Sequence, residues 1–191
     1  MRIGEKLFFI AMMFCGSAVY AQTYQLTDGG IKSVVGSTDV ELKFYDASTV
    51  RVLKSPQGKV FEKKSLAVVE EPEKVRLSVK ENGSDVRLRT SAMEVAFNTE
   101  TGIVTFYAPD GRRLLAEQGQ PSFKEFDDAG NNTFTVKQAF GLDKDEPLYG
   151  LGILQNGKMS QRGQTKRMVQ GNVEDFIPFV QSVKGYGIYW D

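Results

Sequence analysis

The sequence predicts an all-β fold, a β-sandwich, on three observations. Apolar residues occupy alternate positions in short stretches, as at Val40, Leu42 and Phe44, which is the pattern of half-buried strands. Turn signals such as Asn82-Gly83 recur about every eight to twelve residues. No stretch combines capping residues with apolar residues at helical spacing. Many short strands separated by frequent turns are typical of a sandwich or a barrel.

The first half of the chain contains most of the alternating stretches. Strands are predicted at 40–45, 49–53, 75–80 and 86–97, and a shorter apolar run covers 65–69. Asn82-Gly83 is predicted to make a tight turn, because both residues tolerate a positive φ.

The second half continues in the same way. Thr101-Gly102 turns the chain into a strand at 103–107, and Pro109-Asp110-Gly111 predicts a hairpin whose returning strand covers 112–117. The stretch 123–132 is rich in Asp, Asn and Gly and is predicted to be a loop. Alternation resumes at 133–140, slightly out of step at Ala139, which indicates a bulge.

The first 21 residues have the pattern of an export signal. Arg2 and Lys6 are basic, an apolar run of about eight residues follows at 7–14, and Ala21 ends a stretch suited to cleavage. The run is too short to span a bilayer, which needs about 20 apolar residues. A lipoprotein signal at Cys15 is the alternative, although the bulky residue before Cys15 fits such a site poorly. We therefore expect a periplasmic or extracellular protein.

The mature chain, 22–191, is predicted to be one domain that relies on its own core, because the only cysteine is lost with the signal. It keeps 22 basic and 23 acidic residues. This balance predicts no attraction to nucleic acid, and no later segment is apolar enough for a membrane span.

The sequence contains no histidine. This excludes Ser-His-Asp and Cys-His catalysis and histidine-based zinc sites. Carboxylates, Lys and Tyr are the remaining reactive groups. We expect no cofactor and no metal.

Four segments resemble family 31 glycoside hydrolases in their order and spacing. Residues 146–152, Glu-Pro-Leu-Tyr-Gly-Leu-Gly, resemble that family's YGLGE segment, with Ile153 in place of the acidic residue. The others are 48–52, 101–115 and the block from Ile177-Pro178-Phe179 to Asp191. Within these segments, Gly150 and Gly152 suit a close approach of two backbones, and Pro178 suits an edge or a bulge.

The resemblance implies an N-terminal β-sandwich of the galactose-mutarotase type, which in the family packs against a catalytic (β/α)₈ barrel. The barrel carries both catalytic aspartates of a retaining mechanism, so this chain is expected to contain no catalytic residue and to be truncated. Loss of the last strands of the sandwich is compatible with such a truncation. The implied role is to brace the barrel of an exo-acting α-glucosidase or α-xylosidase and to supply a loop of its pocket wall. The implied substrate is an α-linked oligosaccharide or polysaccharide.

The resemblance places the pocket-wall loop at 155–175. Gln170 and Asn172 are the predicted substrate-binding residues, because amides both donate and accept hydrogen bonds to sugar hydroxyls, and Arg167 is the next candidate. Gly171 between them is expected to adopt a positive φ. An ordinary solvated polar loop is the alternative.

Two further readings concern the C-terminal segment. Asp175 and Asp191 are rejected as a catalytic pair, because a retaining pair needs carboxyls about 5 Å apart around a shaped pocket. The aromatic residues there, Phe176, Phe179, Tyr186, Tyr189 and Trp190, are expected in the core or at a domain interface rather than as a sugar-stacking platform. The alternative function, from a different class, is a free-standing secreted carbohydrate-binding β-sandwich module.

Overall fold

The computed structural model describes residues 23–59 and 64–191. The predicted signal peptide lies outside the described residues. The described residues form fifteen strands, every pair antiparallel, and no helix. The prediction of an all-β fold is therefore confirmed. None of these residues makes a helix long and apolar enough to cross a membrane.

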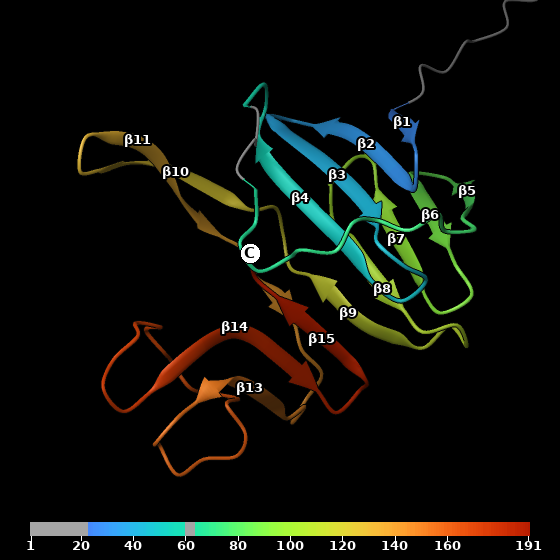
Figure 1. Ribbon diagram of the computed structural model, residues 1–191. Helices are drawn as coiled ribbons and strands as arrows, with labels where there is room; N and C mark the ends of the chain where they lie inside the picture. Colours follow the sequence, from blue (N-terminus) through green and yellow to red (C-terminus); the bar gives the residue numbers. More distant parts are fainter. Residues whose placement is uncertain (1–22, 60–63) are drawn as a thin grey trace, which may run out of the picture.

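Two sheets form the sandwich (Figure 1). The first has the order β1-β2-β3-β4 and consists of β1 (Tyr24–Thr27), β2 (Gly30–Val35), β3 (Thr38–Phe44) and β4 (Val50–Pro56). The second has the order β12-β9-β8-β7-β6-β5. Its strands are β5 (Ser78–Asn82), β6 (Asp85–Arg89), β7 (Glu94–Asn98), β8 (Val104–Tyr107), β9 (Arg113–Glu117) and β12 (Phe140–Gly141). No strand was predicted from the sequence for the residues of β1 or β2.

The core lies between these two sheets. In β3, buried residues alternate with half-buried ones along the whole strand, which is the period of two expected of a strand with one face inward. The second sheet contributes apolar residues from β6, β7 and β8 to the same core. The buried cluster is Ile31, Val35, Val40, Leu42, Phe44, Val86, Leu88, Met93, Val95, Phe97 and Val104.

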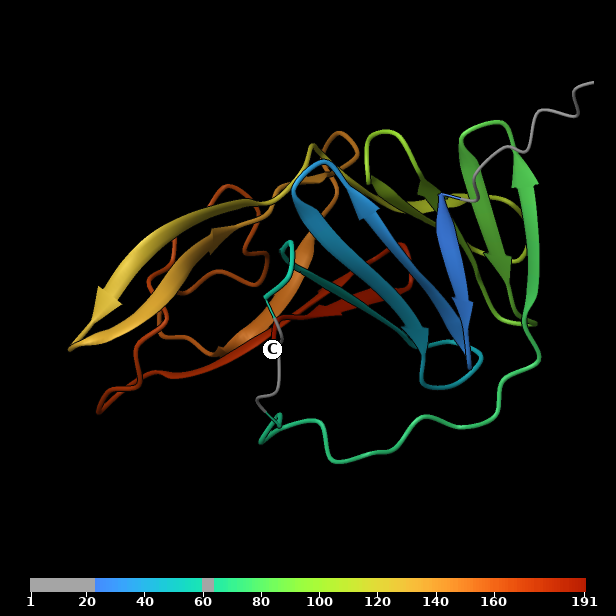
Figure 2. The ribbon, with the colours of Figure 1, turned by 90° about the horizontal axis from the view of Figure 1, so that it is seen from above.

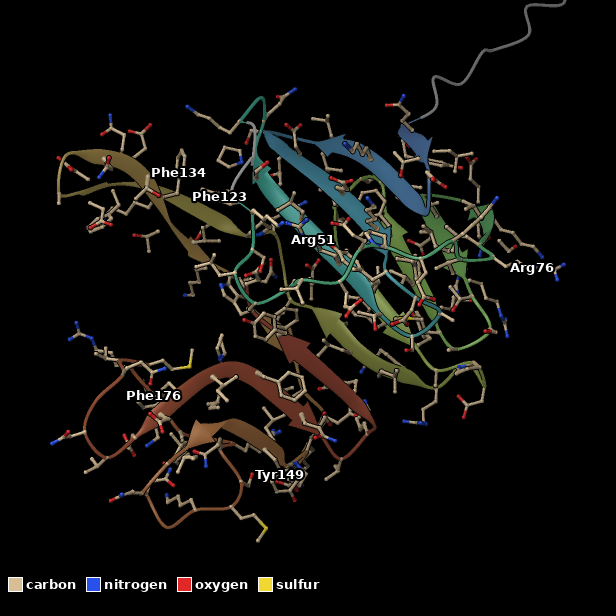
Figure 3. The ribbon with its side chains drawn as sticks, viewed as in Figure 1. Arg51, Arg76, Phe123, Phe134, Tyr149 and Phe176 are labelled. Carbon is tan, nitrogen blue, oxygen red and sulfur yellow. The ribbon has the colours of Figure 1, made fainter. Side chains whose placement is uncertain are left out.

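The stretch predicted as a loop at 123–132 is a β-hairpin, so that prediction was wrong. β10 (Ser122–Asp128) pairs with β11 (Asn131–Lys137) as a separate ribbon that projects from the sandwich (Figure 2). Ala129 and Gly130 both have a positive φ, as a two-residue hairpin turn requires. Phe123 and Phe134 meet edge to face across the two strands, with ring centroids 6.4 Å apart (Figure 3).

Other strand predictions need smaller corrections. Residues 65–69 form no strand and belong to an extended segment that runs along the sandwich to β5 (Figure 2), and Leu66 on it is 92% exposed. The hairpin turns at Gly83 and Gly111 are confirmed, and both residues have a positive φ. The predicted strand at 133–140 is interrupted after Lys137, before β12 begins.

A third sheet, β13-β14-β15, carries two of the four segments that resemble family 31, 146–152 and 177–191. It consists of β13 (Leu148–Ile153), β14 (Asp175–Ser182) and β15 (Tyr186–Tyr189). The register between β13 and β14 shifts between Gly150 and Gly152, and Pro178 lies on β14 within that irregular stretch, as a residue without an N–H group should.

Gly150 and Gly152 allow β13 to pass close to β14. Both have a positive φ, +111° and +99°. A Cβ at Gly150 would lie 2.5 Å from the carbonyl oxygen of Phe179, and one at Gly152 would lie closer still to that of Asp175. The close approach expected at these two residues is therefore confirmed.

Candidate functional site

The loop between β13 and β14, residues 154–174, is the candidate site. It projects from the three-stranded sheet, on which Tyr149 and Phe176 mark β13 and β14 (Figure 3). Two groups of hydrogen bonds hold it, one in each half.

The first half of the loop folds back onto the start of β13. The amide of Gln161 donates to the carbonyl of Leu148 at 2.7 Å, and the guanidinium of Arg162 donates to the carbonyl of Glu146 at 3.0 Å. Asn156 donates its amide to the side chain of Gln161 at 3.0 Å. This half is therefore fixed by backbone groups that precede the loop.

The second half is held by Gln170. Its side-chain amide donates to the carbonyl of Phe176 at 2.9 Å and accepts the Phe176 N–H at 2.8 Å. A side-chain amide thus pairs with the backbone as a neighbouring strand would. Gln170 is exposed, but both ends of its amide are already engaged.

Asn172 and Arg167 are both exposed, and neither side chain makes a hydrogen bond or ion pair within the described part of the chain. Gly171 does not have a positive φ, so that expectation was wrong. The structure therefore separates the predicted substrate-binding residues: Gln170 shapes the loop, whereas Asn172 and Arg167 point their polar groups outward.

The base of the loop is built on a buried carboxylate. Glu146 is 4% exposed, and its Oε1 accepts the hydroxyls of Ser182 and Tyr186, the latter at 2.6 Å. Its Oε2 accepts the N–H of Asp143 at 2.9 Å. Burial raises the pKa of Glu146, but the hydrogen bonds from Ser182 and Tyr186 outweigh it and hold the pKa below its usual value. The carboxylate is therefore the stable form.

Hollows of the described surface lie away from the loop. Two shallow hollows of about 520 and 590 Å³ lie elsewhere, one beside the segment 73–78 and one over the outer face of the β1–β4 sheet. No residue of the loop lines either of them. Asp191 accepts a hydrogen bond from Ser65 at 2.9 Å, and Asp175 begins β14. Neither carboxylate lines one of these two hollows.

Comparison with known proteins identifies the domain. Residues 39–191 match the family described as the glycosyl hydrolase 31 N-terminal galactose mutarotase-like domain. The chain belongs to this family. The match covers the sandwich from β3 onward, the hairpin β10–β11 and the whole of the three-stranded sheet.

Individual relatives of the family 31 domain are much longer proteins. The chain is 29% identical over 167 residues to an α-xylosidase of Saccharolobus solfataricus, covering 82% of this chain and 22% of the relative. It is 30% identical over 139 residues to α-glucosidase 2 of Bacillus thermoamyloliquefaciens, covering 73% of this chain and 16% of the relative. The chain thus spans about a fifth of the curated relatives it matches.

Solved structures agree on the fold. The chain superimposes on the α-xylosidase of Xanthomonas citri with a TM-score of 0.83 and 30% identity, covering 87% of this chain and 19% of that one. A soil-metagenome α-xylosidase crystallised with xylose gives a TM-score of 0.74 at 21% identity, covering 88% of this chain and 28% of that one.

The five aromatic residues of the C-terminal segment of this family 31 domain do not belong to its buried core. Phe179 is 39% exposed, Tyr189 40% and Trp190 48%. Apolar residues of the loop and of β14 are exposed as well: Met168, Val169, Val173 and Ile177. For these seven exposed residues of the loop, of β14 and of 189–190 we use the name apolar face; Phe179 and Tyr189 among them are register partners on β14 and β15. Of the two places expected for the aromatic residues, the core is excluded.

Sequence reasoning missed Glu146 as a residue of the site. Glu146 lies in the segment that resembles family 31, but a single acidic residue before a strand is ordinarily expected to be exposed to solvent. Its partners Ser182 and Tyr186 are 36 and 40 residues away, and no local pattern connects them. The one available signal was Ser182, a small hydroxyl residue within the block from Ile177 to Asp191 that resembles family 31.

Proposed function

We propose that the chain is the N-terminal domain of an exo-acting, retaining α-glycosidase, in which it braces the catalytic barrel and supplies a loop of the pocket wall. The observation that carries this proposal is the family membership of residues 39–191, together with a loop, 154–174, that lines neither of the two hollows described above. A wall of this kind needs a second body to complete the site.

The apolar face supports the bracing role. Its seven residues are 39–63% exposed, and burying a large apolar side chain stabilises an interface by about 1.5–3 kcal/mol. Exposed apolar patches on one face of a domain typically mark an interface. The barrel that follows this domain in family 31 enzymes is the partner we infer.

The proposed substrate is an α-linked xyloside or glucoside, because the relatives described above include α-xylosidases and an α-glucosidase. Amide and guanidinium groups at the exposed positions Asn172 and Arg167 offer neutral and charged donors to sugar hydroxyls. Asp175 and Asp191 line neither of the two hollows of the described residues, and we assign hydrolysis to the barrel.

The test compares the full-length gene product with the isolated chain on aryl α-xylosides and aryl α-glucosides. We expect turnover by the full-length protein and none above background by the chain. Turnover by the isolated chain that disappears in Asp175→Asn or Asp191→Asn would contradict the proposal. Tight binding of a polysaccharide by the isolated chain, with no activity in the full-length product, would favour the free-standing binding module.

We further propose that the protein is exported, on the pattern of residues 1–21. Mass spectrometry of secreted material should give Gln22 as the mature N-terminus. An acylated Cys15 would instead establish a lipoprotein.

A further inference from the structure

Glu146 occupies the point where three parts of the site meet. It lies just before β13, its carboxylate binds the end of β14 through Ser182, and it binds the start of β15 through Tyr186. Its backbone carbonyl accepts the guanidinium of Arg162, which belongs to the loop. Glu146 thus connects the hairpin of β14 and β15 to the loop 154–174.

Neutral donors surround the carboxylate. The nearby ammonium of Lys184 bonds to Asp143 at 2.8 Å, and the hydrogen bonds to Glu146 come from two hydroxyls and one backbone N–H. All three donate, so the site requires a group that only accepts. A carboxylate satisfies this requirement, whereas a carboxamide must turn its NH₂ toward one of the donors.

We propose that Glu146 is a positioning residue for the loop 154–174. Its buried carboxylate locks β14 to β15, and its carbonyl fixes Arg162, so that the orientation of the loop depends on this one residue. The proposal deepens the proposed function, because it assigns what orients the pocket wall.

The first test uses limited proteolysis of the chain. Trypsin can cut the loop at Lys158, Arg162, Lys166 and Arg167 and the ribbon β10–β11 at Lys124 and Lys137. Glu146→Gln should accelerate cleavage in the loop by about tenfold, since hydrogen bonds to a charged group are the strong ones. Cleavage in the ribbon should not change. Equal acceleration at both places, or none, would overturn the proposal.

Glu117→Gln is the matched control. Glu117 is also a buried carboxylate, 8% exposed, but it lies in the sandwich, bonded to Lys54 and to the N–H of Val104. Its loss should weaken the fold without accelerating cleavage in the loop under native conditions. Loop cleavage that rises as much as in Glu146→Gln would show that any buried carboxylate has this effect, and would sink the proposal.

Milder variants serve if Glu146→Gln fails to fold. Tyr186→Phe removes one donor and should accelerate loop cleavage about threefold, in line with one hydrogen bond. In a Tyr186→Phe, Ser182→Ala background, the further change Glu146→Gln should have a clearly smaller effect than it has alone, because both hydroxyl donors to the carboxylate are gone. Full additivity would separate Glu146 from these partners and contradict the proposal.

The catalytic arm uses the full-length protein. Glu146→Gln should raise KM for the preferred aryl glycoside by about three- to tenfold, the range of one lost neutral hydrogen bond, with kcat changed less. If proteolysis responds and KM does not, Glu146 positions a loop that is not a pocket wall, and the proposed function fails while the positioning role stands. If neither responds, the positioning role fails.

Discussion

Lys54 on β4 donates a hydrogen bond to Glu117 on β9 at 2.5 Å, and this ion pair joins the two sheets of the sandwich. The two side chains are only 7% and 4% exposed. Lys54 also donates to the carbonyl of Gly102 at 2.9 Å, and Glu117 accepts the N–H of Val104 at 2.8 Å. The pair therefore fixes β4 against the turn and strand that precede β9.

Breaking this pair on one side should be costly. Glu117→Ala leaves the Lys54 ammonium buried without its partner, and we expect a loss of about 3–5 kcal/mol in the free energy of unfolding. Urea denaturation of the chain would measure it. The double variant Lys54→Met, Glu117→Leu should lose much less, because no charge remains buried. A double variant as unstable as the single one would contradict this account.

The two buried carboxylates should give opposite pH dependences. Burial raises the pKa of Glu117 above its ordinary 4.5, so the part of its contribution that depends on its protonation is fully present below pH 4.5 and is lost as pH rises through the folded-state pKa. The pKa of Glu146 lies below 4.5, so its contribution is present above pH 4.5 and is lost as pH falls through the folded-state pKa.

Unfolding of the wild type, Glu117→Gln and Glu146→Gln from about pH 3.5 to 7 would check both signs. The stability difference between wild type and Glu117→Gln should shrink as pH rises, and that between wild type and Glu146→Gln should grow. Parallel curves for both variants would refute the assignment of the two shifts.

Alanine at Gly150 or Gly152 should destabilise the three-stranded sheet. A Cβ would strike the β14 backbone, and both residues have a positive φ, so each variant should lose more than about 1 kcal/mol. Thermal unfolding with loop proteolysis would report it. Gly171→Ala is the control, because nothing lies within 4 Å of its added Cβ and its φ is not positive. It should be neutral.

Gln170 and Asn172 should differ in how they affect the site. Gln170→Ala removes both hydrogen bonds to Phe176, so it should raise loop proteolysis as well as KM of the full-length enzyme by about three- to tenfold. Asn172→Ala should raise KM to a similar extent while leaving proteolysis unchanged. Unchanged kinetics in both variants would move the pocket-wall role to Arg167.

The isolated chain should self-associate through its apolar face. Phe179, Tyr189 and Trp190 are exposed. In addition, β15 is an edge strand, because among the described strands only β14 pairs with it, and such an edge can pair with a strand of another chain. Analytical ultracentrifugation should show oligomers that decrease in Phe179→Lys. Leu26→Lys is the control, because Leu26 is an exposed apolar residue on β1, in a different sheet. A monodisperse wild-type monomer would contradict this expectation.

Much of the sandwich could be read from the sequence, because strand alternation and turn chemistry are local. The hairpin turns at Gly83 and Gly111 needed only the residues beside them. In the ribbon β10–β11, the predicted strand at 133–140 covers most of β11, but β10 was missed because it is largely exposed and keeps no clear alternation. Its turn at Ala129 was missed because alanine rarely adopts a positive φ.

The candidate site divides in the same way. The position of the loop followed from the segments on either side of it. Gly150 and Gly152 predicted a close approach of two backbones. The inward engagement of Gln170 and the burial of Glu146 were not readable, because each depends on partners brought in by strand register.

The sequence by itself determined the all-β class, the family and the location of the loop, since these depend on patterns within a few residues or on ordered segments along the chain. Only the tertiary structure decided that Glu146 meets Ser182 and Tyr186, and that Lys54 meets Glu117 across 63 positions. The reason is physical: a buried charge is stable only where the fold assembles its hydrogen-bond partners, and that assembly is a property of the stacked sheets rather than of any single strand.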